Sequence, residues 1–121
     1  MKKVLVVEDD RLIAKMYWRM LSGHYEVQLA YDGEAGLAAV ASFEPDLVLL
    51  DLNMPKVSGR QVLMELQKQG VLKTLPVVVV SNEADALSQM KVKELGAWEY
   101  VTKADIELDQ LMTLCKKYLG E

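Results

Sequence analysis

The chain has 121 residues, of which 51% are hydrophobic and 26% charged, and its formal net charge is −4 at pH 7. These values suit a single domain over residues 1–121, and the acidic balance argues against direct nucleic-acid binding, which requires a basic surface. No apolar run approaches the roughly 20 residues that cross a bilayer, and the early acids in MKKVLVVEDD exclude a signal peptide, so we expect no membrane contact.

The first predicted elements are a strand at 3–7, KVLVV, and a helix at 11–21. The strand is a continuous run of aliphatic residues rich in β-branching. Asp10 is a suitable N-cap for the helix, because its carboxylate can accept hydrogen bonds from amides of the first turn. Helical spacing groups five apolar residues on one stripe, namely Ile13, Met16, Tyr17, Met20 and Leu21.

A strand at 26–30, EVQLA, a helix at 33–43 and a strand at 46–50, DLVLL, follow. The helix begins after Asp32, and the third strand ends directly before Asp51. Four consecutive aliphatic residues indicate a strand that helices cover on both faces. A buried carboxylate at the end of such a strand is costly unless it has partners or a cation.

Ser58 and Gln61 have the spacing of a capping box, in which each side chain bonds the backbone of the other, so a third helix begins at Ser58. PVVVV at 76–80 predicts the fourth strand, again apolar throughout. A fourth helix is predicted over 83–95. Its apolar stripe is weak and consists of Leu87, Met90 and Leu95.

The last elements are a strand at 98–102, WEYVT, and a helix at 105–118 that begins at Asp105. The helix has a buried stripe of Leu108, Leu111 and Met112. Cys115 lies at helical spacing on the same side, so we expect a small core or semi-buried thiol. A lone cysteine excludes an internal disulfide and favours a cytoplasmic protein.

This alternation of five strands and five helices predicts an α/β fold with a doubly wound parallel sheet. In such sheets ligands bind beyond the carboxyl ends of the strands. Four of these ends carry polar side chains that would meet there. They are Glu8, Asp9 and Asp10 after the first strand, Asp51 and Asn53 after the third, Ser81, Asn82 and Glu83 after the fourth, and Thr102 and Lys103 after the fifth.

Glu8, Asp9 and Asp51 would repel one another at this edge, and a divalent cation would relieve the repulsion. An all-oxygen ligand set without histidine or cysteine suits Mg²⁺, which leaves coordination positions for a phosphate. With a hydroxyl from Ser81 and an amine from Lys103, the group suits phosphoryl transfer, with Asp51 as the nucleophile. Each residue alone has a simpler structural role, but the combination at four strand ends favours a site.

The segments VLVVEDD, LVLLDLNMPKVSG, VVVVS and LGAWEYVTK carry a further signal in combination. Through them the chain resembles the receiver domain of two-component response regulators along nearly its whole length, and it is similar to stand-alone chemotaxis-type regulators. The resemblance implies a flavodoxin-like (βα)5 fold with strand order 2-1-3-4-5.

The resemblance also implies that Asp51 accepts a phosphoryl group from a histidine kinase, a phosphotransfer protein or a small phosphodonor. Mg²⁺ would be bound by Asp9, Asp51 and the backbone carbonyl of Asn53, with Glu8 acting through water. Such a domain is a regulator rather than an enzyme, with at most self-phosphorylation and autodephosphorylation activity.

Ser81 and Lys103 would contact the phosphoryl group, and Tyr100 lies where the family has an aromatic switch residue. Movement of Ser81 and Tyr100 would reshape the face formed by the fourth helix, the fifth strand and the fifth helix. This face would bind a downstream protein target, and the chain would be a monomer or a phosphorylation-dependent dimer.

The chain departs from the family at two positions. Ala104 follows Lys103 where the family usually has proline, often with a cis bond; a cis non-proline bond costs ~3 kcal/mol, so we predict a trans bond and a rerouted loop. Asn82 stands where a small residue is usual. Together with Asn53 and Glu83, Asn82 is expected to tune the rate of dephosphorylation or the access of donors.

Two other functions stay open at this point. A degenerate receiver would bind partners without phosphorylation, and Ala104 is its only support. A magnesium-dependent phosphatase with an aspartyl nucleophile, as in haloacid-dehalogenase-like proteins, would carry a second acid two residues after the first. Here that position is Asn53.

Overall fold

The computed structural model describes residues 1–83 and 85–120. Within these residues, five strands and five α-helices alternate, with one short 3₁₀ helix, η1, before β4. The elements are β1 (Lys3–Val7), α1 (Arg11–Leu21), β2 (Glu26–Ala30), α2 (Gly33–Phe43), β3 (Leu47–Leu50), α3 (Gly59–Lys68), η1 (Val71–Lys73), β4 (Val77–Ser81), α4 (Ala86–Glu94), β5 (Glu99–Thr102) and α5 (Leu108–Leu119).

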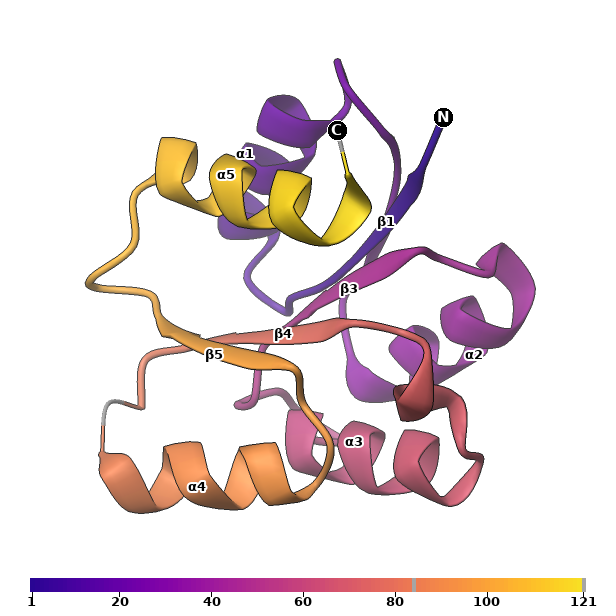
Figure 1. Cartoon of the computed structure of the whole chain (residues 1–121), viewed down its shortest axis with the longest axis vertical. Coiled ribbons are helices and arrows are strands. Elements are labelled where there is room, and N and C mark those ends of the chain that lie inside the picture. Colours follow the sequence, from indigo (N-terminus) through magenta and orange to yellow (C-terminus); the bar gives the residue numbers. More distant parts are fainter. Residues whose placement is uncertain (84, 121) are drawn as a thin grey trace.

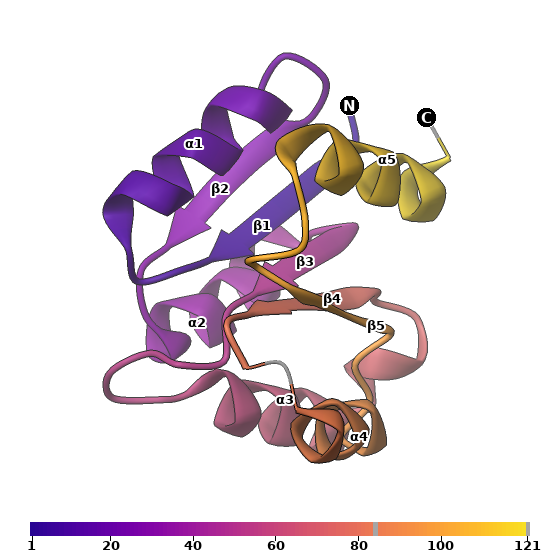
Figure 2. The same cartoon turned by 90° about the vertical axis from the view of Figure 1, so that its left-hand side faces the viewer.

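All strand pairs are parallel, and the strand order is β2-β1-β3-β4-β5. Parallel neighbours require crossover connections, which the helices supply. Figure 1 shows α1 and α5 on one face of the sheet and α2, α3 and α4 on the other, and the turned view in Figure 2 shows the same three layers. The predicted doubly wound α/β fold with strand order 2-1-3-4-5 is therefore confirmed.

The sheet separates two hydrophobic cores. Successive strand residues point to opposite faces. In β3, Leu47 and Leu49 belong to the core beneath α1 and α5, whereas Val48 and Leu50 belong to the core beneath α2, α3 and α4. Both faces of the central strands need apolar residues for this reason, which explains the unbroken aliphatic runs.

Side-chain caps fix the starts of the first three helices as predicted. Asp10 accepts hydrogen bonds from the Leu12 and Ile13 amides, and Asp32 caps α2 in the same way. Ser58 and Gln61 form the expected capping box of α3. Each cap satisfies amides that have no partner within the helix and so defines where the helix begins.

The fourth and fifth helices begin later than predicted. Asp85 caps α4, accepting from the Ser88 amide at 2.9 Å, so the helix starts at Ala86 rather than 83; residue 84 of the predicted segment lies outside the described residues. In the last helix, the Glu107 amide donates to Gln110 Oε1 at 2.8 Å, and the helix starts at Leu108. Asp105, the predicted start, lies in a turn instead.

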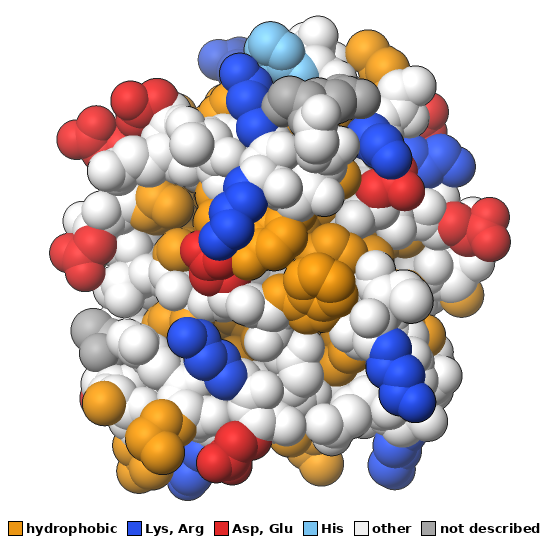
Figure 3. Space-filling view, viewed as in Figure 1, with side chains coloured by type: hydrophobic (Ala, Val, Ile, Leu, Met, Phe, Trp, Pro, Cys, Tyr) orange, Lys and Arg blue, Asp and Glu red, His pale blue; other side chains and the backbone are white. Residues whose placement is uncertain are grey.

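Several residues assigned to buried stripes are exposed. Met16 is 44% exposed, Leu87 and Met90 are each 59% exposed and Leu108 is 39% exposed, whereas Val92 is the buried residue of α4. Figure 3 shows hydrophobic side chains on the face that carries α4, β5 and α5. Helical spacing defines an apolar stripe but not how much of it a neighbouring element covers, which accounts for the error.

Both ends of the described chain lie near the amino ends of the strands. β1 runs away from the N-terminus, and α5 returns to the same side of the molecule (Figure 1). Cys115 on α5 is fully buried, as predicted, and burial raises the pKa of its thiol to about 12. Over residues 1–83 and 85–120, no helix combines the length and apolar character that crossing a bilayer requires.

Candidate functional site

The register of β1 and β3 places two acids side by side at the carboxyl edge of the sheet. Val7 pairs with Leu50, so the next residues of the two strands, Glu8 and Asp51, are neighbours. The Asp51 amide donates to the Val7 carbonyl at 3.0 Å, which extends the ladder by one step beyond the strands. The position of both acids thus follows directly from the strand pairing.

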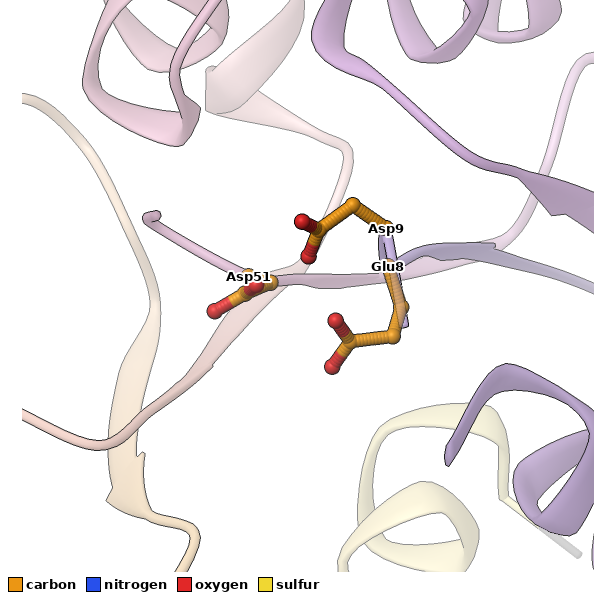
Figure 4. Close-up of side chains that lie close together, drawn as sticks. All are labelled: Glu8, Asp9 and Asp51. Atoms are coloured by element: carbon orange, nitrogen blue, oxygen red, sulfur yellow. The ribbon is translucent and has the colours of Figure 1, made fainter. Parts of the chain in front are cut away.

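Asp9 joins these two acids in one cluster. Carboxylate oxygens of Glu8, Asp9 and Asp51 all lie within 4.8 Å of one another, and in Figure 4 the three side chains surround a common space. Glu8 and Asp51 are only 2% and 6% exposed, whereas Asp9 faces solvent. Such a set of hard oxygen ligands, open on one side, could hold a divalent cation.

Lys103 supplies a positive charge to the cluster. Its Nζ lies 2.5 Å from Glu8 Oε1 and 3.5 Å from Asp51 Oδ1. The Lys103 amide donates to the Ser81 carbonyl at 2.8 Å and so extends the pairing of β4 with β5. The peptide bond to Ala104 is trans, as predicted, and the lysine still reaches the acids.

Burial dominates the electrostatics of the cluster. It raises the pKa of Glu8 from 4.5 to about 7, although a hydrogen bond from Lys103 opposes this rise. Burial likewise raises the pKa of Asp51, against the influence of the Lys103 charge. For Lys103 burial acts to lower the pKa, but the contacts with Glu8 and Asp51 outweigh it, and the net shift is upward. The cluster therefore favours a proton or an added cation.

The remaining predicted residues lie in β5 and at or just after the carboxyl ends of β3 and β4. Ser81 is fully buried at the end of β4, whereas Asn53 and Asn82 are exposed. The Glu83 amide donates to Ser81 Oγ at 3.2 Å, and the Glu83 carbonyl accepts a hydrogen bond from the Tyr100 hydroxyl. One short segment thus links the two residues that the resemblance implies as a switch.

Comparison with known proteins shows the family. Residues 4–116 match the family model described as the response regulator receiver domain. The chain belongs to this family. Receiver domains are signalling domains of two-component systems rather than typical enzymes, and those of response regulators interact with histidine kinases and downstream effectors.

The curated relatives of this receiver domain include longer regulators. It is 37% identical over 111 residues to the transcriptional regulatory protein DltR of Streptococcus agalactiae, an alignment that covers 91% of this chain and 48% of DltR. The chain thus spans about half the length of the curated relatives that head the comparison.

Solved structures agree with this assignment. The receiver domain of Francisella response regulator 1452 superimposes with a TM-score of 0.91 at 25% identity, covering 99% of this chain and 98% of that one. The Vibrio cholerae chemotaxis protein CheY4 gives a TM-score of 0.88 at 27% identity, with 98% of each chain covered.

The sequence did not indicate one ion pair of this receiver domain. Arg60, the second residue of α3, forms an ion pair with Glu83. The hydrogen bond from Arg60 is the main reason that the pKa of Glu83 is lowered. The two residues are 23 positions apart and belong to different elements, so no spacing rule indicates their contact.

Proposed function

We propose that this receiver domain takes a phosphoryl group onto Asp51 from a histidine kinase or a phosphotransfer protein in the cytoplasm, with Mg²⁺ as cofactor. The observation that supports the proposal best is the meeting of three carboxylates and one ammonium group at a single strand edge. This combination binds a cation and an anion next to each other, which is what phosphoryl transfer needs.

The residues of the cluster fit Mg²⁺. Asp9, Asp51 and the backbone carbonyl of Asn53 would hold the ion, and Glu8 would act through water. Two features support this assignment. The carboxylate oxygens of Glu8, Asp9 and Asp51 lie within 4.8 Å of one another, and all of these donors are hard oxygen atoms. The bound ion would neutralise negative charge between the Asp51 carboxylate and the incoming phosphoryl group.

In the transfer step, a carboxylate oxygen of Asp51 attacks phosphorus in line with the leaving group. A phosphorus–oxygen bond forms as the phosphorus–nitrogen bond of the phosphohistidine breaks, and the electron pair stays on the imidazole, which takes up a proton. Lys103, which is shared between Glu8 and Asp51 beforehand, turns to a phosphoryl oxygen. The product is an acyl phosphate.

The switch follows from added charge. Phosphorylation adds about −1.5 to −2 charges at neutral pH, which attract the Ser81 hydroxyl and Lys103. Movement of Ser81 would disturb its contact with the Glu83 amide and thereby the carbonyl that Tyr100 binds. Tyr100 would then turn inward and reshape the face of α4, β5 and α5, through which a downstream protein binds.

Mass spectrometry of the intact protein tests the proposal. After incubation with acetyl phosphate and Mg²⁺, we expect the native chain to gain one phosphoryl group and the Asp51→Asn variant to gain none. Incubation with EDTA in place of Mg²⁺ should prevent the gain. An unmodified native chain in the presence of Mg²⁺ would contradict the proposal and favour a degenerate receiver.

A further inference from the structure

The first turn of α3, which contains Arg60, packs against the backbone of the proposed phosphoacceptor. Gly59 begins the helix, and a Cβ atom at this position would lie 2.3 Å from the Asp51 carbonyl oxygen. The Gly59 amide also donates to the Leu52 carbonyl at 2.9 Å. The helix start is therefore packed directly on the Asp51 backbone, and Arg60 is the next residue of the helix.

Arg60 connects α3 to the segment after β4. Its Nη2 pairs with Glu83 Oε2, and the two side chains are 34% and 26% exposed. The backbone of Glu83 is held separately, by Ser81 on its amide and by Tyr100 on its carbonyl. The side chain of Glu83 has Arg60 as its strongest partner, and it also hydrogen-bonds with Ser88 and Asn53.

We call the solvent-exposed side of the acidic cluster, where Asp9 lies, the entrance to the site, and most charged side chains near it are acidic. Glu8, Asp9 and Asp51 form the acidic cluster, and the Lys103 ammonium is already shared by two of them. Glu83 adds a partly exposed carboxylate, which hydrogen-bonds with Asn53, two residues after Asp51. A phosphodonor is an anion as well, so the neutralisation of this carboxylate affects how readily the donor approaches.

We propose that Arg60 is a positioning residue for the phosphorylation of Asp51. It holds the Glu83 carboxylate against α3 and neutralises it, so that an anionic donor meets a less negative entrance. Arg60 acts through Glu83 and not on the reacting atoms. The inference rests on the proposed phosphorylation of Asp51, and it makes the effect of Arg60 depend on the charge of the donor.

Time courses of phosphorylation with two donors test the inference. We compare acetyl phosphate with phosphoramidate, which carries one fewer negative charge, and follow the intact protein by mass spectrometry with Mg²⁺ present. Arg60→Gln should slow the reaction with acetyl phosphate roughly twofold to fivefold and the reaction with phosphoramidate less. Arg60→Lys, which keeps the charge, should restore most of the rate. A structural defect alone would slow both reactions alike.

Two further variants isolate the contact. Arg19→Gln removes the same charge from the last turn of α1 and should leave the ratio of the two rates unchanged. In a Glu83→Gln background, Arg60→Gln should slow the reaction with acetyl phosphate less, because there is no longer a carboxylate for Arg60 to hold against α3. Thermal unfolding checks that each variant is folded.

The outcomes separate this inference from the proposed function. Equal slowing with both donors, or undiminished slowing in the Glu83→Gln background, would overturn the role of Arg60 while phosphorylation of the native chain stands. A native chain that neither donor modifies would contradict phosphorylation itself, and the role of Arg60 would fall with it.

Discussion

Glu8 illustrates how strongly one buried carboxyl group depends on its partners. Its Oε1 lies 2.5 Å from Lys103 Nζ, and the residue is only 2% exposed, so Lys103 rather than solvent is its main partner. A carboxyl group with a pKa of about 7 is partly protonated at neutral pH, so Glu8 is sensitive to any added cation.

We expect the free energy of unfolding, measured in EDTA, to fall as the pH rises from 4.5 to about 7. Folded Glu8 binds its proton more tightly than the unfolded chain does, so this stabilisation is complete below pH 4.5 and is lost as the pH passes the folded pKa. Burial raises the pKa of Asp51 as well, which acts in the same direction. Urea denaturation across this range measures the decline. A decline of the same size in Glu8→Gln would contradict this explanation.

Asn82 allows a second prediction about a single residue. It is exposed and follows Ser81 directly, so we predict that its side chain limits the space open to an attacking water molecule. We expect Asn82→Ala to speed hydrolysis of the phosphorylated form about threefold, which corresponds to less than ~1 kcal/mol in the barrier. Loss of the phosphoryl group over time is the measurement, with Gln28→Ala on β2 as the control. Unchanged hydrolysis would exclude this role.

The start of α3 is packed closely against the backbone of Asp51 and Leu52 at Gly59. A methyl group there would approach the Asp51 carbonyl oxygen to 2.3 Å and the Leu52 Cα to 2.7 Å, both of which belong to the backbone and cannot move aside as a side chain would. We expect Gly59→Ala to lower the free energy of unfolding by about 1–3 kcal/mol. Gly23→Ala, with no atom within 4 Å, is the matched control. Chemical denaturation measures the free energy of unfolding of both variants. Equal values would contradict the close packing at Gly59.

The helix α4 is held much more loosely than α3. Its buried contact comes from Val92, whereas Val62, Leu63 and Leu66 are all buried in α3. Few buried apolar contacts permit local opening at low free energy. We therefore expect backbone amides of α4 to exchange with deuterium faster than those of α3, as mass spectrometry of peptic fragments would show. Equal protection of the two helices would argue against α4 as the element that moves.

The contrast between predicted and observed elements has a physical origin. The central strands β1, β3 and β4 were predictable to within a residue because burial on both faces demands continuous aliphatic runs, as in the segment that ends directly before Asp51. The start of α5 was not, because Asp105 and Glu107 are both suitable caps and only the contact with Gln110 distinguishes them. The sequence shows which residues are suitable caps, but the choice between two suitable caps depends on the contacts that form in the folded chain.

The candidate site also contains some contacts that the sequence predicts and one that it does not. Glu8 and Asp51 are neighbours because they follow paired strands, and strand positions are visible in the sequence. The contact between Arg60 and Glu83 joins two segments whose approach depends on how α3 packs. Contacts between flexible charged side chains of distant segments have no periodic signature, so the sequence could not indicate this one.

For the molecule as a whole, the proposed cofactor should act as a stabilising ligand. An ion that binds the folded chain alone adds about 1.4 kcal/mol to the free energy of unfolding at roughly tenfold excess over its dissociation constant. We expect Mg²⁺ to raise the urea midpoint of the native chain and to have little effect on Asp9→Asn, whose side chain is exposed and belongs to the acidic cluster. Equal responses of the two proteins to Mg²⁺ would contradict a site at these residues.

The direction of the strands also has a practical consequence. Both ends of the described chain lie away from the carboxyl ends of the strands (Figure 1), and Asp51 directly follows one of these ends, that of β3. An affinity tag or a tether to a sensor surface, attached at either end, would leave the acidic edge facing bulk solution. Kinase docking could then be recorded on immobilised protein without steric interference from the support.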